Sequence, residues 1–126
     1  MSSSLFEDVC QNIIELDKTI RFAGIANMRR TIISAKYRAG LIPLLTQEET
    51  FGSVEQSVLR MTTRRLMEAK LGKTIYSITF YEKVKRAVIP IGKDGDFILM
   101  VSFDNEADYD SIIRNKIMPL ISYHQI

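Results

Sequence analysis

The side chains best suited to catalysis or metal binding are few in this sequence. It contains one cysteine, Cys10, and one histidine, His124. Cys10 lies in an apolar stripe, with no histidine or other base nearby in sequence to form a thiolate, so we expect a buried structural thiol. His124 has no second histidine or cysteine with which to complete a zinc site. These two residues predict neither a nucleophile nor a metal ligand.

A run of alternating acids resembles the start of a calcium-binding loop: Asp104, Glu106, Asp108 and Asp110. Such a loop needs glycine at its sixth position and glutamate at its twelfth, where this chain has Tyr109 and Asn115. We interpret the run as the acidic first turns of a helix, where negative charge complements the helix dipole. Neither a phosphate-binding glycine loop nor a nucleophile elbow occurs. We therefore expect no catalytic residue, no metal, no cofactor and no enzymatic activity.

The charged residues lie in blocks that the net charge of +2 conceals. Residues 1–17 carry a net charge of −4, residues 18–93 carry +10 and residues 94–126 carry −4. The central block suits an acidic partner, although bases scattered over solvated faces are the simpler interpretation. The candidates for a basic partner-binding surface are Arg60, Arg64, Lys83, Lys85 and Arg86.

Aromatic residues lie near these basic residues in the sequence, which is also typical of a sheet surface on which nucleic-acid bases stack. The rings are Tyr76, Phe80 and Tyr81. If the sheet is covered on both faces, half of these rings point into a core and cannot stack on bases. We therefore do not expect nucleic acid to be the main partner.

The composition places the chain among globular proteins of one domain. It has 126 residues, of which 46% are hydrophobic and 25% charged. No run approaches the roughly 20 apolar residues that span a bilayer. The first residues lack the basic and apolar regions of a secretory signal. With a single cysteine, these features predict a cytoplasmic protein without membrane insertion.

Hydrophobic periodicity predicts eight elements in the order α-β-β-α-β-β-β-α. This order predicts the α+β class, with a five-stranded, mostly antiparallel sheet. The predicted elements are a helix over 4–18, a hairpin over 19–38, a central helix over 46–71, a three-strand meander over 74–103 and a helix over 105–118 that Pro119 ends. Thr46 and Glu49 form a capping box at the start of the central helix.

Four details within these elements bear on function. The apolar run 97–103 predicts a strand in the middle of the sheet. Pro90 should lie at a sheet edge, a strand end or a bulge, because it cannot donate a ladder hydrogen bond. The connector 39–45 is unusually apolar, and we expect it to pack under a helix, with contact to a partner as the alternative. The central helix carries an apolar stripe of Phe51, Val54, Val58, Met61, Leu66 and Ala69, with Met67 and Leu71 outside it as a second patch.

The element order resembles that of the roadblock/dynein-light-chain domain, a small profilin- and longin-like fold. Three segments, Ile20-Arg21-Phe22-Ala23-Gly24-Ile25, Ser57-Val58-Leu59-Arg60-Met61 and Leu71-Gly72-Lys73-Thr74-Ile75-Tyr76, also look like an uncharacterised archaeal family of small roadblock-like proteins. The resemblance covers nearly the whole chain.

The resemblance implies a homodimer that pairs through the central helix and the strand after it, extending one sheet across two subunits. It also implies a non-enzymatic scaffold that regulates a small GTPase. The candidate interface residues on these elements are Glu55, Leu59, Arg65, Met67, Leu71, Tyr76, Ile78 and Phe80.

Two other functions stay open at this point. A sensory domain of PAS-like shape would hold a small ligand in an apolar pocket of at least about 300 Å³. Nucleic-acid binding through the basic central segment would depend steeply on salt.

Overall fold

A five-stranded sheet forms the frame of the molecule. The computed structural model describes residues 3–126. The elements are α1 (Ser3–Leu16), β1 (Ile20–Asn27), β2 (Ile32–Tyr37), α2 (Gln47–Arg65), α3 (Glu68–Leu71), β3 (Ser77–Phe80), β4 (Val84–Ile91), η1 (Lys93–Gly95), β5 (Phe97–Asp104), α4 (Tyr109–Ile112), η2 (Ile113–Ile117) and α5 (Met118–Tyr123). The spatial order is β2-β1-β5-β4-β3, and every pairing is antiparallel. The predicted α+β class and five-stranded sheet are therefore confirmed.

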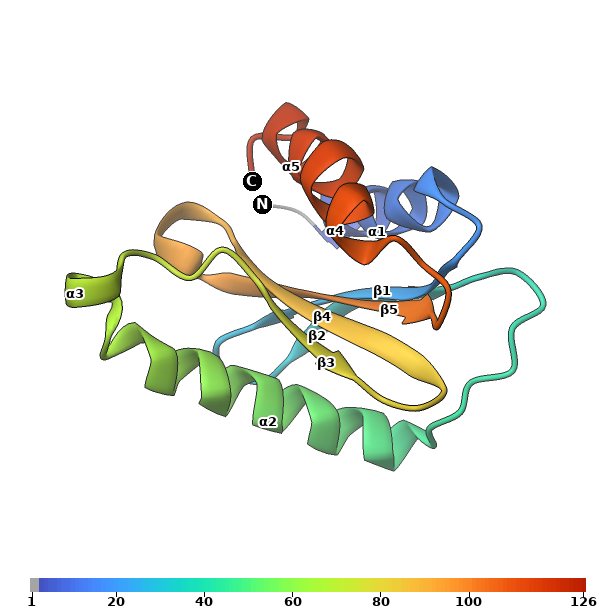
Figure 1. Ribbon diagram of the computed structural model, residues 1–126, viewed down its shortest axis with the longest axis horizontal. Coiled ribbons are helices and arrows are strands. Elements are labelled where there is room, and N and C mark those ends of the chain that lie inside the picture. The colour runs from blue at the N-terminus through green and yellow to red at the C-terminus, as the bar shows by residue number, and fades with distance from the viewer. Residues whose placement is uncertain (1–2) are drawn as a thin grey trace.

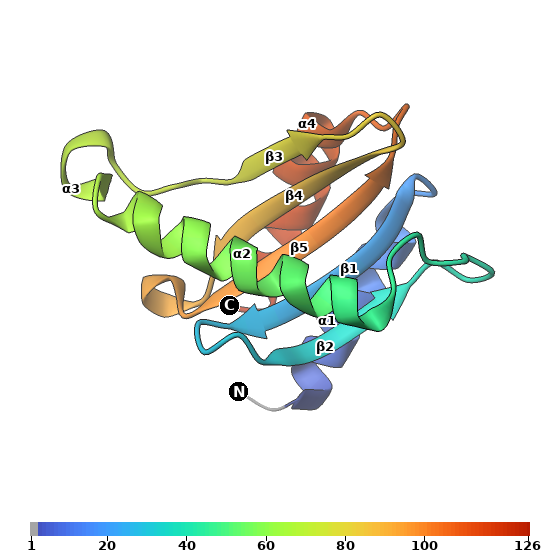
Figure 2. The same ribbon diagram turned by 90° about the horizontal axis from the view of Figure 1, so that it is seen from below.

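The sheet is covered on both faces, which makes three layers. Helix α1 and the C-terminal helices α4 and α5 pack on one face, and α2 crosses the other face diagonally (Figures 1 and 2). The larger apolar core lies on the α1 side and includes Phe6, Ile13, Leu99 and Phe103. A smaller core lies on the α2 side, where Val54, Val58 and Met61 meet the sheet. None of the helices in residues 3–126 is long and apolar enough to cross a bilayer.

Strand β5 lies in the middle of the sheet, as its apolar run predicts. It pairs with β1 on one side and β4 on the other. Alternate residues reach the two cores: Leu99 and Val101 face α1, while Ile98 and Met100 face α2. A strand between two helical layers buries both faces, so it carries apolar residues at both parities.

Pro90 lies in β4, which is internal to the sheet, and the short neighbouring strand explains how it is tolerated. Pro90 pairs with Ile98 of β5. On the other side, β3 begins at Ser77, opposite Val88, and does not reach Pro90. At Pro90, β4 is locally an edge strand, where a missing N–H breaks no ladder on that side.

The central helix is shorter than predicted. Instead of one helix over 46–71, the chain forms α2, ends it at Arg65 and resumes as the short α3. The capping box is present: the Glu49 backbone N–H donates to the Thr46 hydroxyl (3.1 Å) and the Thr46 N–H to the Glu49 carboxylate (2.9 Å). The predicted stripe is correct only in its centre, because Phe51 and Leu66 are 49% and 84% exposed.

The C-terminal helix also differs from its predicted range of 105–118. It begins at Tyr109 and continues through Pro119 to Tyr123. The backbone accommodates the proline by a π-helical turn over Ile113–Ile117, in which the Met118 N–H donates to the carbonyl of Ile113. Such a turn absorbs a missing donor that would otherwise end the helix.

Candidate ligand-binding and partner-binding surfaces

Cys10 and His124 have different surroundings, one in the core and the other just after α5. Cys10 is fully buried in the core between α1 and the sheet, and this burial raises the pKa of its thiol to about 11. The prediction that Cys10 is buried is confirmed. The His124 ring lies against Tyr123, with 5.3 Å between ring centroids. Across residues 3–126, no group of three or more His, Cys, Asp and Glu side chains is gathered as a metal site requires.

Asp104 joins three parts of the chain at one end of the sheet. Its carboxylate accepts from Arg38 at 2.7 and 3.2 Å and from Arg21 at 3.1 Å. These guanidinium groups, Arg38 foremost, hold the pKa of Asp104 below its usual range. Arg38 also donates to the Lys18 carbonyl at 2.8 Å. The cluster ties the ends of β1, β2 and β5 together.

The acidic run does not form the first turns of a helix, contrary to our interpretation. Asp104 ends β5 and the helix begins only at Tyr109, so the first three acids precede it. Asp110 lies in the first helical turn and accepts hydrogen bonds from the Tyr76 hydroxyl and from Arg114. Both contacts lower the pKa of Asp110. Its role is to bind the segment before β3 to α4.

The candidate interface residues do not lie on one face. Leu59 is 66% exposed on α2. It lies one helical turn from Glu55, whose carboxylate is 3.9 Å from Arg30 in the β1–β2 turn. Tyr76 and Ile78 pack against the core on the opposite side of the sheet. Arg65 donates to the Gly95 carbonyl in the β4–β5 turn and is half-buried.

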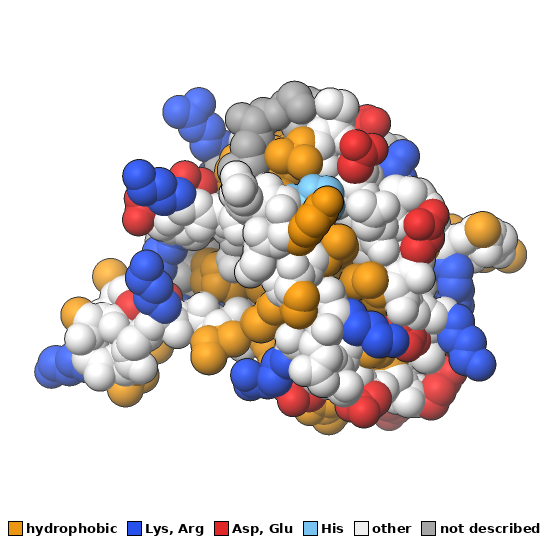
Figure 3. Space-filling model, turned by 90° about the horizontal axis from the view of Figure 1, so that it is seen from above, with side chains coloured by type: hydrophobic (Ala, Val, Ile, Leu, Met, Phe, Trp, Pro, Cys, Tyr) orange, Lys and Arg blue, Asp and Glu red, His pale blue; other side chains and the backbone are white. Residues whose placement is uncertain are grey.

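The remaining interface candidates lie at the β3 edge of the molecule. Met67 and Leu71 are exposed at the end of α2 and on α3, together with Leu66 and Ile75. We call Leu66, Met67, Leu71 and Ile75 the apolar corner. The end of α2 and α3 project from the body at the left of Figure 1, and hydrophobic side chains appear on the projection at the left of Figure 3. Phe80, at the end of the edge strand β3, is exposed and stacks edge-on against Tyr109.

The basic candidates divide between the two faces of the sheet. Lys85 faces α4, where its ammonium donates to the Ala107 carbonyl (3.2 Å) and lies over the rings of Phe80 and Tyr109. Lys83 and the three arginines lie on the α2 face instead. The aromatic candidates divide in the same way, since Tyr76 and Phe80 face α4 while Tyr81 faces α2. No bare aromatic and basic sheet surface of the kind that stacks nucleic-acid bases is formed by these residues.

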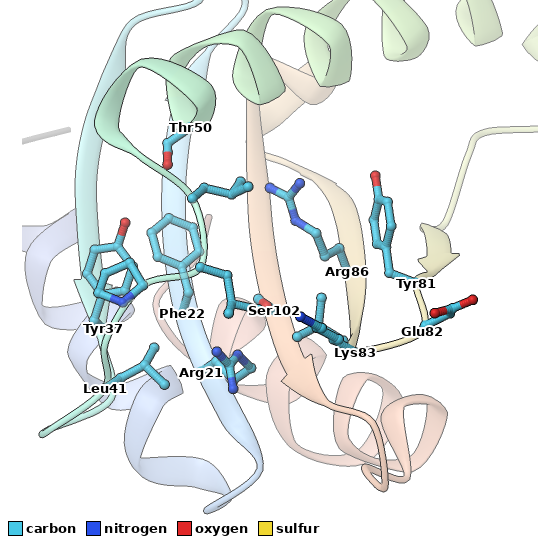
Figure 4. Close-up of a pocket in the computed structure, with 14 residues that line it drawn as sticks. Arg21, Phe22, Tyr37, Leu41, Thr50, Tyr81, Glu82, Lys83, Arg86 and Ser102 are labelled. Atoms are coloured by element: carbon cyan, nitrogen blue, oxygen red, sulfur yellow. The ribbon is translucent and has the colours of Figure 1, made fainter.

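A hollow of about 520 Å³ opens on the α2 face, at the end of the sheet that α2 leaves uncovered. Phe22, Tyr37 and Leu41 form one side, and Lys83, Arg86 and Tyr81 come from the other (Figure 4). Its remaining lining residues are Arg21, Pro43, Leu44, Leu45, Thr50, Glu82, Val84 and Ser102.

A smaller polar groove of about 60 Å³ continues from this hollow between α2 and β3–β4. Three of the candidate bases line it: Arg60, Arg64 and Arg86. Arg64 donates to the Ser77 hydroxyl at 3.4 Å. The structure thus brings together three of the five basic candidates and places Lys83 at the neighbouring hollow.

The apolar connector is the signal that points to the hollow in the sequence. We expected residues 39–45 to pack under a helix, but Ile42 and Leu44 are 84% and 57% exposed. Leu41, Pro43, Leu44 and Leu45 wall the hollow instead. Arg21, Phe22 and Tyr37 also line the hollow, but their sequence positions are typical of ordinary strand residues and do not indicate this role.

Comparison with known proteins identifies the class of fold. No protein-family model and no curated protein matches the sequence. Among solved structures, a roadblock/LC7 domain from Streptomyces avermitilis superposes with a TM-score of 0.73 at 11% identity, covering 94% of this chain and 93% of that one. The chain has the roadblock-like α+β fold.

Two named proteins share this fold. The gliding protein MglB of Thermus thermophilus gives a TM-score of 0.74 at 11% identity, covering 97% of this chain and 89% of that one. MglC of Myxococcus xanthus gives a TM-score of 0.59 at 7% identity, covering 94% and 98%. At these identities, the similarity establishes the fold alone.

Proposed function

We propose that this chain is a non-enzymatic, cytoplasmic interaction module that works as a homodimer and regulates a small GTPase. The observation that carries the proposal is the exposed apolar corner beside the open edge strand β3. Its leucines Leu66 and Leu71 are 84% and 78% exposed. An apolar patch and an unpaired strand edge are costly to leave bare, and a second copy covers both at once.

The fold supports this proposal. Sequence resemblance implies roadblock-type pairing, and one solved structure of the same fold is described as MglB with a tetrameric arrangement, at 13% identity. The proposal that the chain regulates a small GTPase rests on the family resemblance, and so does the proposed archaeal affiliation.

Light scattering at micromolar concentration tests the homodimer. We expect twice the chain mass for the wild type and dissociation for Leu71→Asp, because an uncompensated charge enters the interface. Ile42→Asp is the matched control, since Ile42 is 84% exposed against 78% for Leu71 and lies in the connector at the opposite end of the molecule (Figure 1). A strict monomer, or equal behaviour of the two variants, contradicts the proposal.

The GTPase partner needs a separate test. Affinity capture is carried out in the presence of either GDP or a non-hydrolysable GTP analogue. We expect a GTPase whose retention depends on the nucleotide and is reduced in the Leu71→Asp variant. The absence of any nucleotide-dependent GTPase contradicts this part of the proposal.

A second function, small-ligand binding, is favoured by one observation. The hollow of about 520 Å³ exceeds the roughly 300 Å³ expected of a ligand site, and its lining is mainly apolar. Titration with amphipathic probes, described below, tests this function independently of the oligomeric state.

A further inference from the structure

The hollow and the polar groove adjoin each other and are the two unlike ends of one candidate site. They share Phe22, Tyr81, Arg86 and Ser102, so these residues lie where the two meet. Figure 4 shows Arg86 extending from β4 into this junction. A single ligand that occupied both parts would therefore need an apolar part and a polar part joined at Arg86.

The large end suits a hydrocarbon body. Phe22, Tyr37 and Leu41 form one wall, and the connector adds Leu44. Tyr37 and Leu44 are 42% and 57% exposed, so a ligand in the hollow would remove apolar surface from water. The volume of about 520 Å³ lies within the usual range of roughly 300–1,000 Å³ for small-molecule sites.

The small end suits an anion with several acceptor oxygens. Arg60, Arg64 and Arg86 line it, and no Asp or Glu does. Six residues with hydroxyl groups also line it: Ser53, Ser57, Ser77, Thr79, Tyr81 and Ser102. In the described residues 3–126, none of the three arginines forms an ion pair. The groove is about 60 Å³, twice the roughly 30 Å³ share of a liquid water, which suits a headgroup of a few atoms.

The mouth of the hollow carries the same sign of charge. Lys83 lines the hollow and forms no ion pair within the described chain. Arg21 also lines it, while its partner Asp104 is shared with Arg38. Glu82 is the acidic lining residue, and its side chain points away from the hollow (Figure 4). An anion would thus meet an excess of positive charge along its whole path.

We propose that the chain binds a free, amphipathic phosphate monoester, with its hydrocarbon part in the hollow and its phosphate on Arg60, Arg64 and Arg86. A phosphate monoester matches the groove better than a carboxylate because it offers more charge and three acceptor oxygens to guanidinium donors. This inference rests on the second of the two functions above, small-ligand binding, and does not depend on the homodimer.

Calorimetric titration with four probes tests this proposal: decyl phosphate, decanoate, decanol and inorganic phosphate. Decyl phosphate and decanoate are kept below their micellar concentrations. We expect decyl phosphate to bind at least about tenfold more tightly than the other three. Arg60→Gln should weaken decyl phosphate about tenfold and leave decanol unchanged, because Arg60 lines the groove and not the hollow, whereas Leu44→Asp should weaken both. Lys93→Gln, in the exposed β4–β5 turn, is the charge-matched control and should change neither.

The possible outcomes distinguish failure of this inference from failure of the proposed small-ligand binding. If no probe binds, both small-ligand binding and this inference fail, while the homodimer stands. If decanol binds as tightly as decyl phosphate and Arg60→Gln has no effect, the hollow binds neutral ligands and the inference alone fails. If decyl phosphate does not bind but phosphatidylcholine vesicles containing phosphatidic acid do, the surface docks on membranes, and the inference is overturned.

Discussion

Replacing Asp104 with asparagine should destabilise the protein by about 2 kcal/mol at pH 7. The carboxylate accepts three hydrogen bonds from Arg21 and Arg38, at 2.7 to 3.2 Å, and its side chain is 22% exposed. Each hydrogen bond to a buried charged group contributes about 1.5–3 kcal/mol. Partial exposure reduces this sum, and asparagine keeps one acceptor oxygen, so the net loss should be close to that of one bond.

Thermal and urea unfolding measure this loss. At about 2.1 cal/mol/K of unfolding entropy per residue, a chain of 126 residues loses about 8 °C of Tm for 2 kcal/mol. Asp8→Asn is the control, because Asp8 is exposed on α1 and forms no ion pair in the described chain. Its effect should stay within about 0.5 kcal/mol.

The pH dependence distinguishes a charge effect from a loss of shape. The folded-state pKa of Asp104 is lowered, so its stabilisation is complete above the unfolded pKa of about 3.9 and is lost as the pH falls through the folded pKa. The gap in unfolding free energy between wild type and Asp104→Asn should stay constant from pH 7 to about 5, begin to narrow near pH 4 and close below the folded pKa of Asp104. Other carboxylates titrate in both proteins and cancel. A gap below about 0.5 kcal/mol at pH 7, or one that persists in acid, refutes the reasoning.

Three further predictions concern the core. Gly24→Ala should cost about 1–3 kcal/mol in urea unfolding, because its new Cβ would lie 2.6 Å from the Phe22 ring, and Phe22→Leu should relieve part of that cost; equal stabilities would be contrary evidence. Met61→Ala should cost about 2–5 kcal/mol while Leu66→Ala costs under about 0.5, since Met61 is 1% exposed and Leu66 84%; equal losses would contradict the packing of Met61 against the sheet. Cys10 should react with a thiol reagent at neutral pH only at the rate of unfolding, because burial raises its pKa to about 11; fast native-state labelling would contradict this.

The sheet could be predicted because its strands carry local signals. The run 97–103 is apolar at both parities, and only a strand between two covered faces requires that pattern. The capping box at Thr46 and Glu49 likewise acts within four residues, so the start of α2 is predictable from its own sequence.

The ends of the helices could not be predicted, because distant contacts decide them. Nothing local marks the break after Arg65, whose guanidinium is bound by the Gly95 carbonyl in another turn. Pro119 reads as a helix terminator, yet a π-helical turn carries the helix past it, and packing of Ile117 and Ile121 on the core stabilises that turn.

The candidate surfaces were predictable only as separate parts. The spacing of Arg60 and Arg64 on one helix places them on one flank, but their meeting with Arg86 depends on the diagonal crossing of α2 over β4. The predicted interface residues are separated for another reason: Ile78 faces the α1 side of the sheet, whereas Leu59 lies on α2, which covers the other side. The apolar pattern of a helix does not specify the angle at which that helix crosses a sheet.

The connector that walls the hollow has a consequence for how this domain can change. Residues 42–46 are all exposed, so they add little to either core. Both ends are fixed, at one side by the Arg38–Asp104 pair and at the other by the Thr46 capping box. Substitutions between these anchors can reshape the hollow at little cost in stability. The connector side of the hollow can therefore vary, in evolution or by design, while the sheet and the two anchors stay unchanged.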